Sequence, residues 1–368
     1  MSAPEPADAR EGTSEETRVL DPKKGLVLFL FVLISFLGTL ELVKWLFKVA
    51  PPDRYNDFTI ADPQLDFEEV ERSISLGMLR PLVDPEPIPA EKAPELRHKF
   101  VVSSDRVAVV TIGGETRGYL LRVLVYHEFI NDTLGGVPIT IVHQPVSDLV
   151  SVYERTIQGQ TLAFGTSGLQ LDSHVLAYDQ PPMNDRSRLA ESSLWSPMLG
   201  IALAGPRSGE RLKRIPVEVT TWGDFRTRFP EGTIPLPPPD YLKQYRKDPY
   251  TQYLGAERPR FDADPMPEDP STFFDRTIVV AGGGTGEIVA YRTSELLAEG
   301  SVQLTRTQGD LTLNFRVVDR EKEIVAVTAA SGTLDWTLQT FWFTWFASRE
   351  RVEQVAAGQP LSDPRAEN

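Results

Sequence analysis

An apolar segment near the N-terminus places the strongest constraint on what this chain can form. Residues 25–40 contain no charged side chain, and two lysines come directly before them. A helix over residues 26–47 has the ~20 residues that a bilayer requires. A cleaved signal peptide would have a shorter apolar core and a small-residue cleavage site, and no such site precedes the proline pair that follows. We therefore expect one transmembrane helix over residues 25–48.

The charges around this segment predict its orientation. Basic residues flank both ends, but Lys23 and Lys24 directly before the apolar core favour an N-terminus on the cytoplasmic side. Most of the segment 1–24 is rich in Ala, Pro, Glu and Ser. This composition predicts a disordered cytoplasmic tail. The rest of the protein would then lie outside the cytoplasm.

Small and polar side chains on the predicted helix indicate a second use for it. Ser35, Gly38 and Thr39 occupy nearby positions, and small residues allow close approach of two helices. Glu41 would be less costly at the membrane boundary beside a partner helix, or when paired with a nearby lysine. A lone anchor helix with an exposed Glu41 is the alternative.

Charge and cysteine content exclude several classes of function. The formal net charge is −14, which disfavours nucleic acid and anionic lipid surfaces as partners. The chain has no cysteine, and this excludes disulfides, thiol nucleophiles and cysteine-ligated metals. Because an oxidising compartment permits disulfides without demanding them, the location outside the cytoplasm is unaffected.

The remainder of the chain predicts a β-rich α+β body. Residues 49–98 are Pro-rich and acidic, which indicates a stalk or a segment wrapped over the body. Short β-branched runs bounded by glycine turns then predict strands at 107–112, 137–142 and 311–318. Residues 233–272 are rich in Pro, Tyr and Asp and predict a wrapping loop. Residues 351–368 predict a disordered tail.

An internal repeat indicates that the body contains a duplicated β unit. Residues 105–124 and 275–296 both begin with Asp-Arg, enter a glycine turn, reach a tyrosine and end in a Leu-bearing helical turn. A strand with a glycine-containing hairpin follows each of them. We expect one unit in 99–232 and a second in 273–350, arranged as a sandwich or a barrel-like fold.

Glycine and serine motifs in the body favour turns over catalytic loops. Gly282–Gly286 lacks the third glycine of a dinucleotide fingerprint and the lysine of a P-loop. The stretch around Ser167 is only half of a nucleophile elbow. No catalytic residue or organic cofactor is predicted.

Three histidines close together in the sequence suggest a metal site. His127, His143 and His174 lie in the first repeat, and Glu128 could complete a set of ligands for a transition metal. The spacing matches no metal signature, so histidines bonded within the fold are the alternative.

The body resembles the bacterial family DUF3179, a domain of unknown function, from about residue 105 to residue 346. The motifs that carry the resemblance include Gly118-Tyr119, His127-Glu128, Asn131-Asp132, Phe164-Gly165, Ser193-Leu194-Trp195, Thr221-Trp222, Asp248-Pro249-Tyr250 and Phe341-Trp342-Phe343. The resemblance implies Tyr-Cys-Pro where this chain has His143-Gln144-Pro145, so the family's thiol is replaced by Gln144. Because the family is bacterial, the membrane span and orientation predicted above correspond to an inner-membrane protein whose body lies in the periplasm.

Two hypotheses from different classes follow. The first is a non-enzymatic, membrane-anchored accessory or structural subunit that packs on a larger membrane complex through a protein partner. The replaced thiol, the aromatic run at 338–346 and the Pro-rich segments favour it. The second is a periplasmic protein that uses the four residues of the suggested metal site for metal transfer, hydrolysis or redox chemistry.

Overall fold

The computed structural model describes residues 54–95, 100–180, 186–261, 263–284 and 286–361, together with Leu26, Phe29, Val32, Leu33 and Ser35. The chain divides into an N-terminal unit, residues 1–52, and a body, residues 53–368.

The N-terminal unit contains the predicted membrane span. Its five described residues are helical and exposed. Among the described residues, no helix is long and apolar enough to cross a membrane. Most of the predicted span over 25–48 lies outside the described residues. Of the predicted helix contact, Ser35 is described and helical, whereas Gly38, Thr39 and Glu41 lie outside the described residues.

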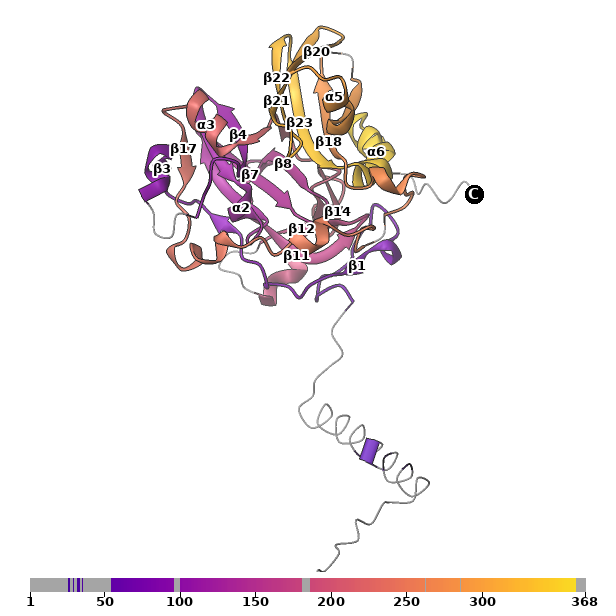
Figure 1. The fold of residues 1–368 in the computed structure, drawn as a ribbon. Coiled ribbons are helices and arrows are strands. Elements are labelled where there is room, and N and C mark those ends of the chain that lie inside the picture. Colours follow the sequence, from indigo (N-terminus) through magenta and orange to yellow (C-terminus); the bar gives the residue numbers. More distant parts are fainter. Residues whose placement is uncertain are drawn as a thin grey trace, which may run out of the picture. The chain divides into compact units, whose positions relative to one another are not determined.

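The body is β-rich, as predicted, and is built from several open sheets (Figure 1). None of the sheets in its described part closes into a barrel, so the barrel-like alternative is wrong. The central sheet has the order β19-β18-β23-β8-β7-β6-β2, with β15 beside β8. Its strands are β2 (Leu82–Val83), β6 (Phe129–Leu134), β7 (Val137–Gln144), β8 (Leu149–Glu154), β15 (Arg214–Ile215), β18 (Arg276–Gly282), β19 (Ile288–Arg292) and β23 (Leu334–Phe341).

Three further sheets and one small hairpin surround the central sheet. The side sheet contains β16 (Glu218–Thr221), β4 (Arg106–Ile112), β5 (Glu115–Leu120), β17 (Thr233–Pro235) and β3 (Pro87–Pro89), in that order. The lower sheet contains β1 (Glu71–Arg72), β11 (Phe164–Leu171), β12 (His174–Asp179), β13 (Leu194–Ser196) and β14 (Ile201–Ala204). The outer sheet contains β20 (Gln303–Gln308), β21 (Leu311–Asp319) and β22 (Ile324–Ser331), and the small hairpin contains β9 (Thr156–Ile157) and β10 (Gln160–Thr161).

Short helices connect the strands, and one longer helix ends the body. The α-helices are α2 (Leu121–Leu124), α3 (Trp222–Arg228), α4 (Thr251–Leu254), α5 (Thr293–Ala298) and α6 (Trp342–Ala356). The 3-10 helices are η1 (Phe67–Glu69), η2 (Ala90–Glu95), η4 (Arg186–Glu191), η5 (Pro239–Tyr241), η6 (Gln244–Arg246) and η7 (Pro270–Thr272). Helix α6 continues past residue 350, where we expected a tail to begin, because Val352 and Val355 are buried in the core.

Strand β4 illustrates why several strands are apolar without alternation. Val107 and Val109 belong to one core cluster, and Ala108 and Val110 belong to another. Successive side chains of a strand point to opposite faces, so both faces of β4 are covered by packed side chains. Four consecutive buried residues are the consequence.

The Pro-rich segments lie on the body itself. The described part of the predicted stalk or wrapping segment, residues 54–95, adds β1 to β11, β2 to β6 and β3 to β17. The predicted loop over 233–272 carries β17 and four short helices. The aromatic run at 338–346 is also internal: Phe341, Phe343 and Trp345 are at most 3% exposed.

The two repeated segments have the same order of elements. Hairpin β4–β5 leads into α2, and hairpin β18–β19 leads into α5. Each hairpin also receives a later antiparallel strand, β16 on β4 and β23 on β18. At the end of these strands, the backbone N–H of Trp222 donates to the carbonyl of Asp105 (2.7 Å), and that of Trp342 donates to the carbonyl of Asp275 (2.8 Å).

Candidate functional site

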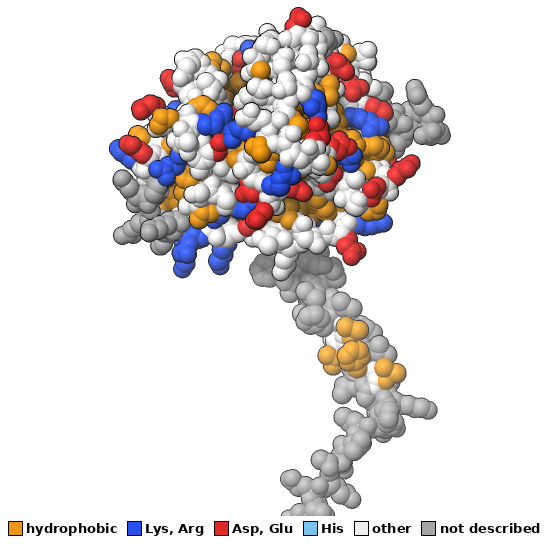
Figure 2. Space-filling model, turned by 45° about the horizontal axis from the view of Figure 1, so that its top comes forward, with side chains coloured by type: hydrophobic (Ala, Val, Ile, Leu, Met, Phe, Trp, Pro, Cys, Tyr) orange, Lys and Arg blue, Asp and Glu red, His pale blue; other side chains and the backbone are white. Residues whose placement is uncertain are grey.

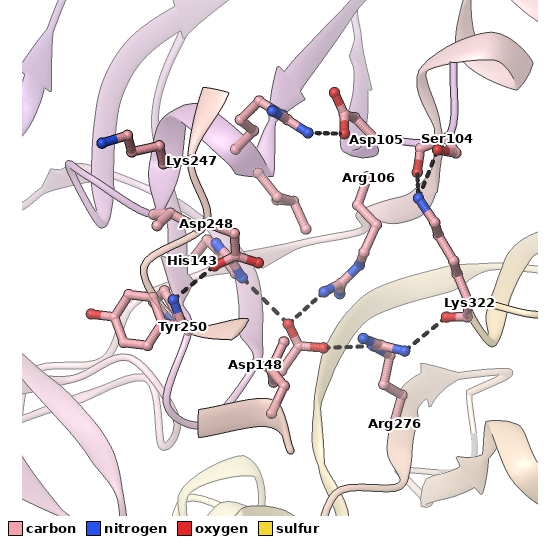
Figure 3. A pocket seen from close by; sticks show the side chains of 15 residues that line it. Ser104, Asp105, Arg106, His143, Asp148, Lys247, Asp248, Tyr250, Arg276 and Lys322 are labelled. Carbon is pink, nitrogen blue, oxygen red and sulfur yellow. Dashed lines mark hydrogen bonds and ion pairs between the residues drawn. The ribbon is translucent and has the colours of Figure 1, made fainter. Parts of the chain in front are cut away.

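A pocket of about 240 Å³ lies where the two repeated segments meet, between the start of β4, the start of β18 and the chain around α4 (Figure 3). Its polar lining includes Arg106, His143, Asp148, Tyr250, Arg276 and Lys322. The volume is somewhat below the ~300–1,000 Å³ typical of pockets for drug-sized ligands. The pocket therefore suits a small molecule.

Asp148 is the centre of the polar floor. It sits in the turn between β7 and β8, and its backbone φ is +50°, a left-handed conformation that Asp adopts more readily than most residues. Arg106 Nη1 donates to Oδ1 (2.6 Å), and Arg276 Nε donates to Oδ2 (3.1 Å). Gln339 Nε2 also donates to Oδ2 (3.2 Å). Strands β4, β18 and β23 thereby converge on one carboxylate.

The protonation states of this floor follow from burial and from its charges. Burial by itself would raise the pKa of Asp148, but Arg106, His143 and Arg276 outweigh it and hold that pKa well below its usual range. Burial lowers the pKa of His143 despite the opposing effect of Asp148. A neutral His143 therefore donates from Nε2 to Asp148 Oδ1 (3.3 Å), which leaves its Nδ1 as an acceptor.

The floor carries more positive than negative charge. Arg106 and Arg276 share one carboxylate, and Nε and Nη2 of Arg106 are buried without a hydrogen-bond partner among the described residues. A buried charge without compensation is costly, and an unsatisfied buried donor calls for an explanation. The chain as a whole has a net charge of −14, so the excess of positive charge at this floor is opposite in sign to the overall charge.

The rim of the pocket adds charged groups of both signs. Arg122 Nη2 pairs with Asp105 Oδ1 (2.5 Å), and Lys322 Nζ donates to Ser104 Oγ (2.6 Å). Lys247 and Asp248 stand together on the opposite rim (Figure 3). Counted as formal charges, the lining holds five cations and three anions.

Four residues of the pocket lining are apolar, and together we call them the wall. Leu121 and Val125 come from α2 and its C-cap, Pro145 follows β7, and Leu254 ends α4. Leu254 is 41% exposed, which is high for a leucine. Beside this wall, burial and then Glu128 raise the pKa of Tyr250 to about 12, so its phenol is neutral at pH 7.

The residues of the suggested metal site do not surround one point. His127 is bonded at both nitrogens, Nδ1 to the carbonyl of Arg80 (2.7 Å) and Nε2 to Tyr245 Oη (2.6 Å). His174 Nε2 contacts Ser196 Oγ (2.7 Å) on the lower sheet. Among the described residues, no group of three or more His, Cys, Asp or Glu side chains is placed to hold a metal ion.

His143 and Glu128 are the two members of that set near the pocket. The backbone N–H of His143 donates to the carbonyl of Glu128 (2.9 Å), and the carboxyl group of Glu128 accepts from Thr166 Oγ1 (2.7 Å). Burial raises the pKa of Glu128 to about 7, against the opposing effect of the Thr166 bond. Its φ of +57° is a left-handed conformation uncommon for glutamate.

Gln144, which the resemblance led us to expect in place of a thiol, faces away from His143. Its Nε2 donates to the carbonyl of Val175 (2.6 Å), and its Oε1 accepts from the N–H of Val175 (2.9 Å). The side chain therefore joins β7 to β12 as a backbone strand would. Neighbouring residues of a strand point to opposite faces, which accounts for the separation from His143.

Comparison with protein families matches residues 82–338 to the description "Protein of unknown function (DUF3179)". The chain belongs to the DUF3179 family. The resemblance inferred from the sequence is thus confirmed, and the match begins earlier than expected, at β2. Comparisons with curated proteins and with solved structures gave no match. The DUF3179 region holds all the lining residues of the pocket.

Sequence reasoning missed the three residues at the centre of the pocket. The repeat carried a signal for two of them, since Arg106 and Arg276 occupy the same position in the two Asp-Arg motifs. No sequence pattern marks Asp148, which follows a strand in an ordinary turn. Only the folded chain shows that both arginines reach it.

Proposed function

We propose that this DUF3179 protein binds a small oxyanion in the pocket between its two repeated segments. The observation that carries the proposal is the pair of guanidinium groups, Arg106 and Arg276, that share the single carboxylate of Asp148. Guanidinium groups are the preferred donors to carboxylates and phosphates. An anion at the floor would supply the missing negative charge and partners for the unsatisfied donors of Arg106.

The arrangement of the segments supports a shared site. In each predicted unit, 99–232 and 273–350, the third strand after the short helix lies next to the last strand of the other unit: β8 pairs with β23, and β22 packs beside β16. The two segments act as copies of one β unit that exchange neighbours. Arg106 and Arg276 are then equivalent residues that face each other across the junction, where one ligand can contact both copies.

The protein would perform this binding while anchored by residues 25–48 to the bacterial inner membrane, with its body in the periplasm. The apolar segment and the lysines before it support this location. The accessory-subunit hypothesis stays a prediction. The aromatic run and the described Pro-rich segments, two features that could contact a partner, pack within the body. On the face in Figure 2, acidic, basic and apolar side chains are interspersed.

Metal binding through His127, Glu128, His143 and His174 also stays a prediction. It is second to anion binding because these four side chains make separate contacts within the fold.

Thermal unfolding of the full chain tests the proposal. Sodium acetate or sodium sulfate would replace sodium chloride at constant ionic strength. A bound ligand at a hundredfold excess over its Kd stabilises the folded state by about 2.7 kcal/mol, so we expect a saturable rise of several degrees in Tm with at least one of the two anions.

Two variants locate the effect. Arg276→Gln is expected to abolish the rise, measured against that variant's own Tm in chloride. Arg226→Gln removes an exposed guanidinium on α3, outside the pocket, and is expected to preserve it. A Tm that is the same in all three salts, or an equal rise in both variants, would overturn the proposal.

A further inference from the structure

The pocket is amphipathic, and this property identifies the class of its ligand. The cationic floor is formed by Arg106 and Arg276 around Asp148, whereas the wall residues are Leu121, Val125, Pro145 and Leu254. In Figure 3, Arg106 and Arg276 approach Asp148 from one side. His143 and Tyr250 lie on its other side. A ligand that fills the whole space therefore needs one charged end and one apolar end.

The charges at the floor of the pocket favour a ligand with a single negative charge. At the buried floor, two guanidinium groups face one carboxylate, which leaves an excess of one positive charge. Asp248 stands exposed at the rim and would repel additional negative charge on a ligand, whereas Asp105 is buried and paired. The remaining cations are engaged or exposed: Arg122 pairs with Asp105, and Lys247 and Lys322 are on the surface. A monoanion is balanced at this floor, whereas a dianion is not.

The exposed apolar residue Leu254 belongs to none of the hydrophobic clusters among the described residues. Leu254 ends α4 with 41% of its surface exposed, and it faces the pocket together with half-buried Val125. Covering such side chains contributes favourable free energy in proportion to the apolar area removed from water. An aliphatic or aromatic body of a ligand would cover them.

We infer that the ligand is a small monocarboxylate with an apolar body. Its carboxylate binds at Arg106 and Arg276, and its apolar body packs on Val125 and Leu254. This inference rests on the proposed function and adds the class of ligand to it. A short-chain fatty acid or an aromatic acid has this chemistry.

Isothermal titration of the full chain with acetate, butanoate and hexanoate tests the inference. Each additional methylene that is buried is expected to tighten binding about twofold to fourfold, until the wall is covered. Hexanamide has the same apolar body without the charge and is expected to bind at least tenfold more weakly than hexanoate. Sulfate, a dianion, is expected to bind more weakly than butanoate.

Matched variants separate the wall from the floor. Leu254→Ser is expected to weaken hexanoate about tenfold and to leave acetate unchanged. Val302→Ser changes another exposed apolar side chain, 65% exposed and outside the pocket lining, and is expected to alter neither. Because both side chains are exposed, neither substitution removes a core contact.

The outcomes distinguish the inference from the proposed function. Acetate binding that requires Arg276, with no gain from longer acids, would overturn the inference and preserve anion binding. Tighter binding of sulfate than of butanoate would have the same meaning. If none of these anions binds, both fail.

Discussion

Arg106 and Arg276 begin equivalent strands in two repeated segments, and they donate to the two oxygens of one carboxylate. Arg106 Nη1 lies 2.6 Å from Oδ1 of Asp148, and Arg276 Nε lies 3.1 Å from Oδ2. The positive charge of the pocket floor follows from this arrangement. Each of the two repeated segments contributes one arginine, and both arginines pair with the same carboxylate, that of Asp148.

Removing that anion should destabilise the body strongly. Asp148→Asn leaves the two partly buried guanidinium groups of Arg106 and Arg276 without their shared counter-charge, which we expect to cost about 3–5 kcal/mol in the free energy of unfolding. Adding Arg276→Gln to this variant should recover part of the loss. Urea unfolding of the full chain measures both, with exposed Asp240→Asn as the control. A cost below ~1 kcal/mol for Asp148→Asn would contradict the central position of this carboxylate.

Glu128 should make stability fall as pH rises. Its pKa is raised from 4.5 to about 7 in the folded state, so the folded chain binds more protons than the unfolded chain between these values. The contribution of Glu128 to the free energy of unfolding is fully present below pH ~4.5. It falls by about 3 kcal/mol as pH rises through ~7.

The Glu128→Gln variant isolates this contribution. The amide keeps an oxygen for Thr166 and does not titrate, so the variant should gain stability relative to the native chain between pH 5 and pH 8. Asp179, whose pKa burial raises to about 6, and the buried histidines titrate in both proteins and cancel in the difference. Parallel pH profiles of the two proteins would show that Glu128 is ionised in the folded chain.

Two adjacent glycines should respond differently to alanine. Gly135 and Gly136 both have positive φ, +54° and +77°, in the turn between β6 and β7. A Cβ at Gly135 would lie 2.3 Å from the carbonyl oxygen of Ile112, whereas one at Gly136 meets nothing within 4 Å. We expect Gly136→Ala to cost about 1–2 kcal/mol from backbone strain alone. Gly135→Ala should cost about 3 kcal/mol or more. Equal midpoints of urea unfolding would contradict the close contact between the two hairpins.

The predicted anchor gives a simple localisation test. Deletion of residues 25–48 should move the chain from the membrane fraction to the soluble fraction, while the full chain should resist an alkaline carbonate wash. A protease added outside the cytoplasmic membrane should reach the body and spare the N-terminal tail. Release of the full chain by carbonate would contradict the membrane span.

The sequence was sufficient to predict local elements and insufficient to predict their partners. Strands predicted at 107–112, 137–142 and 311–318 correspond to β4, β7 and β21, because β-branched runs bounded by glycine turns are determined locally. The contact of β23 with β8 joins residues far apart in sequence, and no local pattern encodes it.

The candidate site shows the same division. His143 was selected for its side chain and does line the pocket, but its contact with Asp148 depends on a turn of no distinctive sequence. His127 and His174 were predicted on the same grounds but lie apart from His143: His127 contacts Tyr245, and His174 contacts Ser196. Closeness in sequence does not determine which sheet a strand joins. The repeated Asp-Arg motif was the sequence signal for the two arginines at the floor of the pocket.

Equilibrium dialysis of the full chain against radiolabelled butanoate tests the central claim most directly, because it counts bound molecules. We predict saturable binding of one butanoate per chain, lost in Arg106→Gln/Arg276→Gln and retained in Arg226→Gln. Uptake that does not saturate, or equal binding by the double variant and the native chain, would contradict a carboxylate site at the junction of the two repeats.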